Sequence, residues 1–189
     1  MYKRQTYTVG RVFGYLPGWF GPELPWWNTT KWNKEATALI AELDANPSFL
    51  CTHETPESKG GRRVRMARYF SGSERLMRGV VKYGSDCEGP PRHVHGGCSA
   101  ATANQIAIDF ASNLVHFPIK HSTSINVDYF MKVPLGSQLG FECKLMEGTH
   151  LNEGEIATKV KFFSLKNGNV YVEADVWFVD FQRPTTSRL

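Results

Sequence analysis

The stretch GPPRHVHGGCSAATANQIAIDFA, residues 89–111, decides the fold of this chain. It begins with a proline pair, continues with two histidines and two glycines, and ends in a long apolar run. Glycine lets the backbone turn sharply and approach a ligand closely, and the first amides of a helix have no partner within the helix. We therefore expect a binding turn that leads into a buried helix from Gly97 to Val115.

Strand-like alternation of apolar and polar residues flanks this helix on both sides. Before it, residues 62–70 and 75–84 form a hairpin pattern around Ser71-Gly72-Ser73. A helix that is apolar on nearly every side must be covered by the sheet. The sequence therefore predicts an α+β fold, in which one curved antiparallel sheet wraps around a long central helix. Four further strands are predicted after the helix, at residues 122–133, 137–148, 154–165 and 170–181.

The remaining parts of the chain predict a less regular organisation. Residues 1–28 are dense in Gly, Pro and aromatic residues, and their prolines exclude a regular helix or a central strand. We expect an irregular arm that packs on its own domain or on a partner. Residues 29–59 predict a helix capped by Thr29 or Thr30, which ends at Asn46-Pro47, and then a polar loop. The main domain is expected at residues 60–183, with a C-terminal tail at 184–189.

Length and composition are those of one soluble globular domain. The chain has 189 residues, of which 41 % are hydrophobic and 21 % are charged. The most apolar stretch, residues 100–115, carries two Asn, one Gln and one Asp, so we expect no transmembrane segment. Four cysteines without a CxxC pair or a secretory leader favour a reducing compartment. Residues 1–22 contain Lys and Arg but no acid, so we expect the mitochondrial matrix or the cytoplasm.

The order of the elements, together with Gly89-Pro90-Pro91 and His95-Gly96-Gly97, resembles the hotdog fold. More narrowly, the chain resembles the acyl-CoA thioesterase branch that includes the human mitochondrial Them-type enzymes and the bacterial phenylacetate-pathway type. The resemblance spans about residues 60–182, and INVDYFMKVPLGS, residues 125–137, looks like the family's strand after the helix. It implies a homo- or heterodimer joined through sheet edges, an acyl-CoA or other acyl thioester as substrate or ligand, and no cofactor.

The glycine turn suits an oxygen atom that gains negative charge. A free N–H of Gly96 or Gly97, with the partial positive charge of the helix dipole, would stabilise a thioester carbonyl as it becomes tetrahedral. We expect His95 to shape this turn through hydrogen bonds. In the resemblance, Ser122 falls where the Them-type enzymes carry a Thr hydroxyl near the reacting carbonyl.

Two positions near the turn are candidate contacts for the phosphates of coenzyme A. They are Arg92 and Lys132. The family often has two basic residues after the strand's tyrosine, whereas Phe130 and Met131 stand there in this chain. This departure weakens the expectation of a preserved phosphate site.

The decisive departure from the family is on the central helix. The resemblance places a catalytic acid, usually Asp, nine residues after the histidine, and Asn104 stands at that position. An amide cannot take a proton from water. Asp109 would lie about 140° further around the helix, and Asp128 matches a frame residue of the family's strand. We therefore expect impaired or lost turnover, with Asn104 orienting a water molecule or a carbonyl.

Other chemistries are less well supported by the residue pattern. Cys87, His93, His95 and Cys98 have zinc-ligand side chains, but their spacing is not that of a usual structural zinc site, so we predict no metal. Cys98 could act as a nucleophile at the helix start, although no paired base is evident.

The basic stretch and the aromatic N-terminal arm each indicate a kind of binding partner. Residues 58–94 contain nine Lys or Arg and only three acidic residues. This local excess of positive charge suits a phosphorylated ligand or an acidic neighbour. The net charge is only +4 and no nucleic-acid motif is present, so we predict no nucleic-acid binding. The alternative to an acyl-thioester protein is a non-catalytic structural subunit of a larger assembly, for example a mitochondrial one, anchored by the aromatic arm at residues 12–27.

Overall fold

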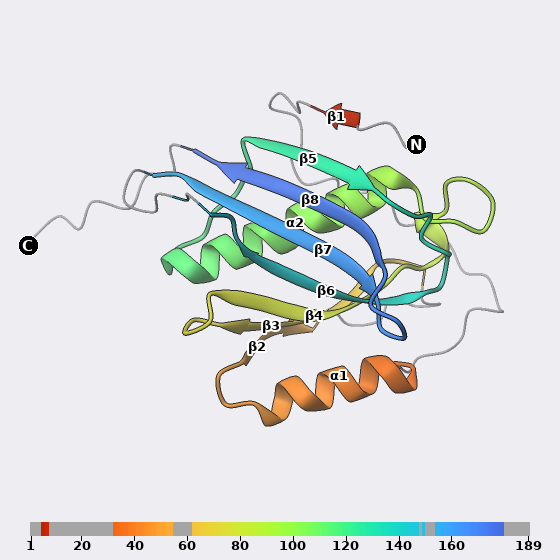
Figure 1. Cartoon of the computed structure of the whole chain (residues 1–189), viewed down its shortest axis with the longest axis horizontal. Coiled ribbons are helices and arrows are strands. Elements are labelled where there is room, and N and C mark those ends of the chain that lie inside the picture. The colour runs from red at the N-terminus through yellow and green to blue at the C-terminus, as the bar shows by residue number, and fades with distance from the viewer. Residues whose placement is uncertain (1–4, 8–31, 55–61, 148, 150–153, 180–189) are drawn as a thin grey trace, which may run out of the picture.

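One antiparallel sheet of eight strands organises the described part of the chain (Figure 1). The computed structural model describes residues 5–7, 32–54, 62–147, 149 and 154–179. The strand order is β1-β5-β8-β7-β6-β4-β3-β2. The strands are β1 (Gln5–Tyr7), β2 (Leu50–Glu54), β3 (Arg65–Ser71), β4 (Leu76–Lys82), β5 (Ser124–Tyr129), β6 (Gln138–Leu145), β7 (Ile156–Ser164) and β8 (Val170–Phe178). The helices are α1 (Lys34–Ala45), a 3-10 helix (Ser85–Cys87) and α2 (Gly96–Val115).

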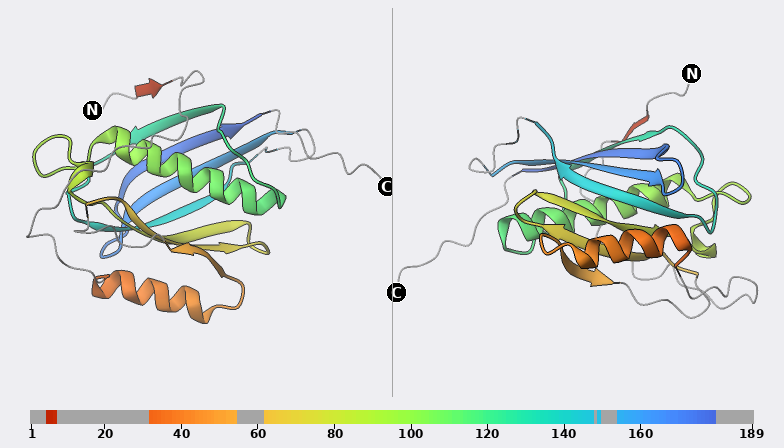
Figure 2. Two further views of the ribbon diagram at one scale, coloured as in Figure 1. Left: turned by 180° about the vertical axis from the view of Figure 1, so that it is seen from behind. Right: turned by 60° about the horizontal axis from the view of Figure 1, so that its bottom comes forward.

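Helix α2 lies across one face of the sheet, as the left view of Figure 2 shows from behind. It contacts strands β5 to β8, and the ring of Phe110 packs edge-on against that of Phe70 in β3. The helix begins at Gly96, one residue before the predicted start. Its buried residues are Cys98, Ser99, Thr102, Ala103, Ile106, Ala107, Phe110 and Ala111.

The sheet covers only one side of α2. Gly97, Ala101 and Gln105 are exposed, and they recur four residues apart, so they share one helix face. The sequence predicted that the sheet covers nearly the whole helix. Alanine and glycine count as apolar in a sequence pattern, but they also occur at exposed positions, so the pattern overestimated the buried face. The structure therefore leaves an uncovered stripe along α2, in which Gly97 and Ala101 are small and Gln105 is polar.

Helix α1 packs on the opposite face of the sheet, where it joins a second core. Ala36, Leu39 and Leu43 supply its buried side, and their partners are in β3 and β4. The predicted caps Thr29 and Thr30 are wrong: Asn33 Oδ1 accepts the N–H of Ala36 at 2.8 Å and begins the helix. Asparagine and threonine are both favoured N-cap residues, so residue type alone did not decide which of them begins the helix.

Two strands lie where the sequence predicted none. The polar segment expected as a loop begins with strand β2, which pairs with β3 and shifts register between Cys51 and His53. Edge strands need no buried face, so β2 lacks the alternation that identifies a strand. Strand β1, within the expected irregular arm, pairs with β5 through Gln5↔Val127 and Tyr7↔Ile125. Residues 8–31 of the arm and the C-terminal tail at 184–189 lie outside the described residues.

Three basic residues of the 58–94 stretch have partners inside the chain. The Arg65 guanidinium lies 4.4 Å from the centre of the Trp32 ring, and Arg78 pairs with Glu42 on α1 at 3.2 Å. Arg68 pairs with Asp109 on α2, on the other face of the sheet. Within the described ranges, no helix is long and apolar enough to cross a membrane.

Candidate functional site

The turn before α2 is tightly pinned to the loop that follows β5. Gly89 N–H donates to His93 C=O at 3.0 Å, and His93 N–H donates to Pro90 C=O at 2.9 Å. Arg92, at the tip, adopts a left-handed conformation with φ 63°. Two bonds, Val94 N–H to Val133 C=O and Leu135 N–H to Arg92 C=O, both 2.9 Å, join the turn to that loop. The turn is therefore a fixed part of the fold.

His95 caps α2 and organises its first amides. Its N–H donates to Cys87 C=O at 2.7 Å, and its Nδ1 accepts the N–H of Gly97 at 3.0 Å. A Cβ on Gly89 would lie 2.8 Å from the Cα of His95, so the close approach of these two residues requires glycine. Since the Gly97 amide is already bonded to His95, Gly97 is no longer a candidate donor to a ligand.

Gly96 presents the one amide of this pair that is available to a ligand. Its N–H has no hydrogen-bond partner among the described residues, and it lies at the positive end of a 20-residue helix. Its C=O accepts a bond of 2.7 Å from the hydroxyl of Tyr129, at the end of β5. A Cβ on Gly96 would lie 3.3 Å from the Tyr129 ring. Gly96 is thus held in place on its carbonyl side and open on its amide side.

Asn104 lies at one margin of the buried face of α2. The residue is partly buried, and its Oδ1 atom is enclosed without a hydrogen-bond partner among the described residues. A buried carbonyl oxygen that lacks a donor costs about 1–3 kcal/mol. This oxygen is therefore poised to accept a hydrogen bond from a water molecule or a ligand.

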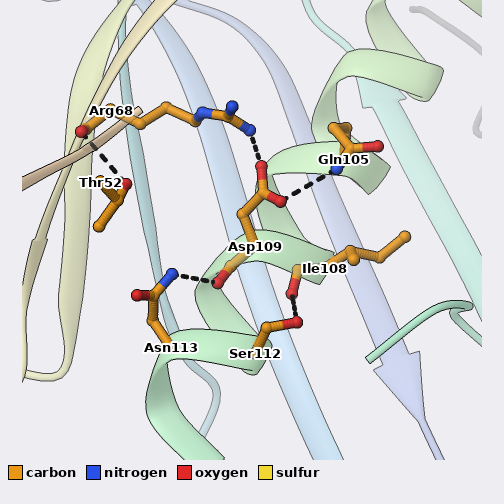
Figure 3. A network of polar contacts seen from close by, with 7 residues as sticks. All are labelled: Thr52, Arg68, Gln105, Ile108, Asp109, Ser112 and Asn113. Carbon is orange, nitrogen blue, oxygen red and sulfur yellow. Dashed lines mark hydrogen bonds and ion pairs between the residues drawn. The ribbon is translucent and has the colours of Figure 1, made fainter. Parts of the chain in front are cut away.

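Asp109 is committed to a different task, as Figure 3 shows. Its carboxylate forms an ion pair with Arg68 of β3, and Gln105 Nε2 donates to its Oδ1 at 3.0 Å. Burial lowers the pKa of Arg68, and the nearby Cys51 opposes that shift. Asp109 lies about 140° around the helix from Asn104, so the two side chains face different sides of α2.

Asp128 belongs to a charged network centred on Lys159, on strand β7. Burial lowers the pKa of Lys159, but its hydrogen bond to Asp175 and the charges of Asp175, Glu173 and Asp128 raise it more. Lys159 pairs with Asp175 at 2.6 Å and with Glu173 at 3.7 Å. Asp128 therefore acts on a neighbouring cation, Lys159, which lies on β7.

The predicted site residues do not converge within one copy of the chain. Gly96 and Asn104 are eight residues apart, which is about 12 Å along a helix. Ser122, partly buried, is seven residues from Tyr129 along an extended chain, or about 23 Å. One thioester carbonyl cannot touch Gly96 and Asn104 of the same copy. Arg92 and Lys132 are both exposed beside the turn.

The alternative zinc site is not assembled. His93 Nδ1 lies 2.8 Å from the carbonyl oxygen of Pro91, and His95 Nδ1 bonds to Gly97. Across the part of the chain that the structure describes, no three His, Cys, Asp or Glu side chains are grouped to hold a metal ion.

Several solved structures similar to this chain are described as thioesterases or thioesterase superfamily proteins. No protein-family model matches the sequence, and no curated protein matches it. A crystal structure of a thioesterase superfamily protein aligns with a TM-score of 0.50 at 25 % identity, over 61 % of this chain and 53 % of that chain. A thioesterase superfamily protein from Shewanella loihica gives 0.49 at 16 %, over 62 % and 91 %. A thioesterase from Haemophilus influenzae gives 0.49 at 12 %, over 61 % and 76 %.

The antiparallel sheet with one long helix against its inner face, and the likeness to the first of these structures, decide the architecture. The chain has a hotdog fold. This confirms the α+β architecture that the sequence predicted. This hotdog chain spans about half the length of the first structure, so the likeness describes the shared domain.

Tyr129 was not identified as a site residue by the sequence pattern. It was part of the matching strand pattern, but its hydroxyl reaches Gly96 only because β5 ends beside the start of α2. A tyrosine at the end of a half-buried strand is a weak signal by itself, since tyrosine is common in strands. The contact between the two elements identifies its role.

Proposed function

We propose that this hotdog protein binds an acyl thioester and that its hydrolytic turnover is impaired or absent. The observation that carries the proposal is the combination of an open Gly96 amide with a carboxamide, Asn104, at the position of the family's acid. Binding needs the first of these features, and fast hydrolysis needs an acid at the second.

The expected chemistry is that of a polarised carbonyl without a base. The thioester oxygen accepts the Gly96 N–H, and the helix dipole favours the charge that builds up there. Hydrolysis would add a water oxygen to the carbonyl carbon, pass a water proton to a base and release the thiolate. Asn104 can orient that water but cannot take its proton. The reaction consumes only water and thioester, so it needs no cofactor.

We further propose that the complete site lies between two copies of the chain. Gly96 and Asn104 are too far apart to meet within one copy, and one stripe of α2 is uncovered. A second copy that packs antiparallel on this side would bring its Asn104 and Ser122 toward Gly96. A dimer would then be the binding unit, in which the two copies meet across α2 as well as through the sheet edges that the resemblance implies.

The ligand that the surface favours is an acyl-CoA or a related acyl thioester. Arg92 and Lys132 are exposed beside the turn, where they can pair with phosphates. Phe130 and Met131 are exposed as well, and both amides of this pair donate to Tyr171 C=O. The loop thus offers apolar contact next to positive charge, which suits a long thioester ligand.

The test compares the wild-type chain with Asn104→Asp and Asn104→Ala. Each protein is titrated with non-hydrolysable thioether analogues of short, medium and long acyl-CoAs, and assayed for thiol release from the matching thioesters. We expect wild-type binding with near-background turnover, and an increase of about 10²–10⁴-fold in turnover for Asn104→Asp.

Two outcomes would contradict the proposal. Robust wild-type turnover that Asn104→Ala abolishes would identify a working enzyme that uses the amide. Absence of binding to every analogue would favour the non-catalytic structural subunit.

A further inference from the structure

Two cysteine side chains lie against each other beneath the glycine turn. Cys87 ends the 3-10 helix and Cys98 lies in the first turn of α2. A side-chain hydrogen bond between them shifts the pKa of each thiol, and burial together with both thiols raises the pKa of the Tyr83 hydroxyl. The two cysteines are 4 % and 8 % exposed, belong to the same core cluster and are free thiols.

The backbone keeps this pair together through a single residue. His95 N–H donates to Cys87 C=O at 2.7 Å, and Cys98 N–H donates to His95 C=O at 2.9 Å. The same His95 caps α2 through its Nδ1. Since both cysteines are bonded to the capping residue, their contact is part of the structure that presents Gly96.

We propose that Cys87 and Cys98 are a redox-active dithiol, which a peroxide oxidises to an intrachain disulfide that locks the Gly96 turn onto the 3-10 helix. This site does not depend on the acyl-thioester function. A disulfide requires the two sulfur atoms to approach to about 2 Å, so the side chains must move together while the bonds to His95 keep their backbones close. The disulfide would close a short loop, residues 87–98, which contains the whole turn.

The two cysteines have different chemical roles. The hydrogen bond from the Cys87 thiol lowers the pKa of Cys98, against the opposing effect of burial. The same hydrogen bond, together with burial, raises the pKa of Cys87. Cys98 is therefore the thiol that ionises and attacks first, and the helix N-terminus adds to this preference.

The reaction balances with hydrogen peroxide as the oxidant. The Cys98 sulfur attacks one peroxide oxygen, the O–O bond breaks, and a sulfenic acid forms with release of hydroxide. The Cys87 sulfur then attacks the Cys98 sulfur, the S–O bond breaks and a second hydroxide leaves. The two hydroxides take the two thiol protons, so two thiols and one peroxide yield one disulfide and two waters.

The other two cysteines serve as internal controls. Cys143 is buried on β6 next to Thr158, and burial raises its pKa. Cys51 is exposed on β2 at the sheet edge. Neither is in the Cys87–Cys98 contact, so neither should enter the same bond.

The experiment oxidises the full-length chain and maps its thiols. Folded protein is treated with hydrogen peroxide, alkylated in denaturant and digested with trypsin without reduction. Lys82, Arg92 and Lys120 place Cys87 and Cys98 on different tryptic peptides, 83–92 and 93–120. We expect these two peptides to be linked, to separate after treatment with a dithiol reductant, and to remain linkable in Cys143→Ala.

Variants of the pair test the order of the steps. In Cys87→Ser we expect Cys98 to progress to sulfenic and sulfinic acid, whereas in Cys98→Ser we expect Cys87 to stay reduced at the same peroxide dose. The proposal is overturned if wild-type Cys87 and Cys98 both alkylate fully after peroxide. A link between Cys98 and Cys51, or sulfinic acid on wild-type Cys98 without a link, would overturn it equally.

Discussion

The hydroxyl of Tyr129 donates a 2.7 Å hydrogen bond to the carbonyl of Gly96 and so ties the end of β5 to the first residue of α2. The ring of the same tyrosine occupies the space that a side chain at position 96 would need. One residue therefore fixes the carbonyl of the turn and leaves little room for a side chain at position 96.

Removal of the Tyr129 hydroxyl should loosen the turn without removing its packing. In Tyr129→Phe the Gly96 carbonyl loses the hydrogen bond from the hydroxyl, and we expect a loss of about 0.5–1.5 kcal/mol in unfolding free energy. We also expect weaker binding of an acyl-CoA thioether analogue, by about threefold to tenfold, since 1.4 kcal/mol is about tenfold in affinity. Calorimetric titration measures the affinity, with Tyr171→Phe on β8 as the matched control. Equal affinities in all three proteins would show that the hydroxyl does not position the amide.

A methyl group at position 96 should disturb the same contact from the other side. In Gly96→Ala the new Cβ would lie 3.3 Å from the Tyr129 ring, so the ring or the helix start must shift. We expect a loss of at least about tenfold in analogue affinity, because a small displacement of a positioned group is costly. Gly72→Ala is the control, since its Cβ would meet its nearest neighbour at 3.7 Å. Undiminished binding by Gly96→Ala would remove this amide from the site.

The Arg68–Asp109 ion pair should contribute to stability between α2 and β3. The side chains are 9 % and 26 % exposed, and Asp109→Asn leaves the Arg68 charge buried without its counter-ion. We expect a loss of about 2–3 kcal/mol in unfolding free energy. Breaking a fully buried ion pair costs about 3–5 kcal/mol, and partial exposure to solvent reduces that cost. Urea unfolding at neutral pH measures it. Glu42→Gln, which breaks the more exposed Arg78 pair, should cost at most about 1 kcal/mol, and an equal loss in both variants would contradict the prediction.

Strand β1 should limit association through the edge of β5. It pairs with Ile125, Asn126 and Val127, which lie in the middle of that strand. Deletion of residues 1–7 uncovers these backbone groups, and an open edge strand tends to pair with another chain. We expect a larger dimer fraction than in the full chain at the same micromolar concentration, measured by sedimentation velocity. An unchanged distribution would show that copies associate elsewhere, for example through the open stripe of α2.

Local sequence patterns predicted the elements that have a buried face. The hairpin of β3 and β4, the helix after His95 and the four later strands all have side chains that repeat with the period of their element. Strands β1 and β2 and the Asn33 cap were missed, because an edge strand needs only backbone partners and a cap depends on one side chain.

The sequence by itself determined the fold class and the glycine turn, and it places Asn104 where the resemblance expects an acid, since these depend on residue identity and spacing along one chain. Only the tertiary structure decided which amide is open. His95 Nδ1 bonds to Gly97 and Tyr129 bonds to Gly96 C=O, which leaves Gly96 N–H as the available donor. It also decided that Asp109 faces Arg68 and that Cys87 meets Cys98. The physical reason is that hydrogen bonds, ion pairs and thiol contacts form between groups that are distant in sequence, and only the packing of α2 on the sheet brings those groups together.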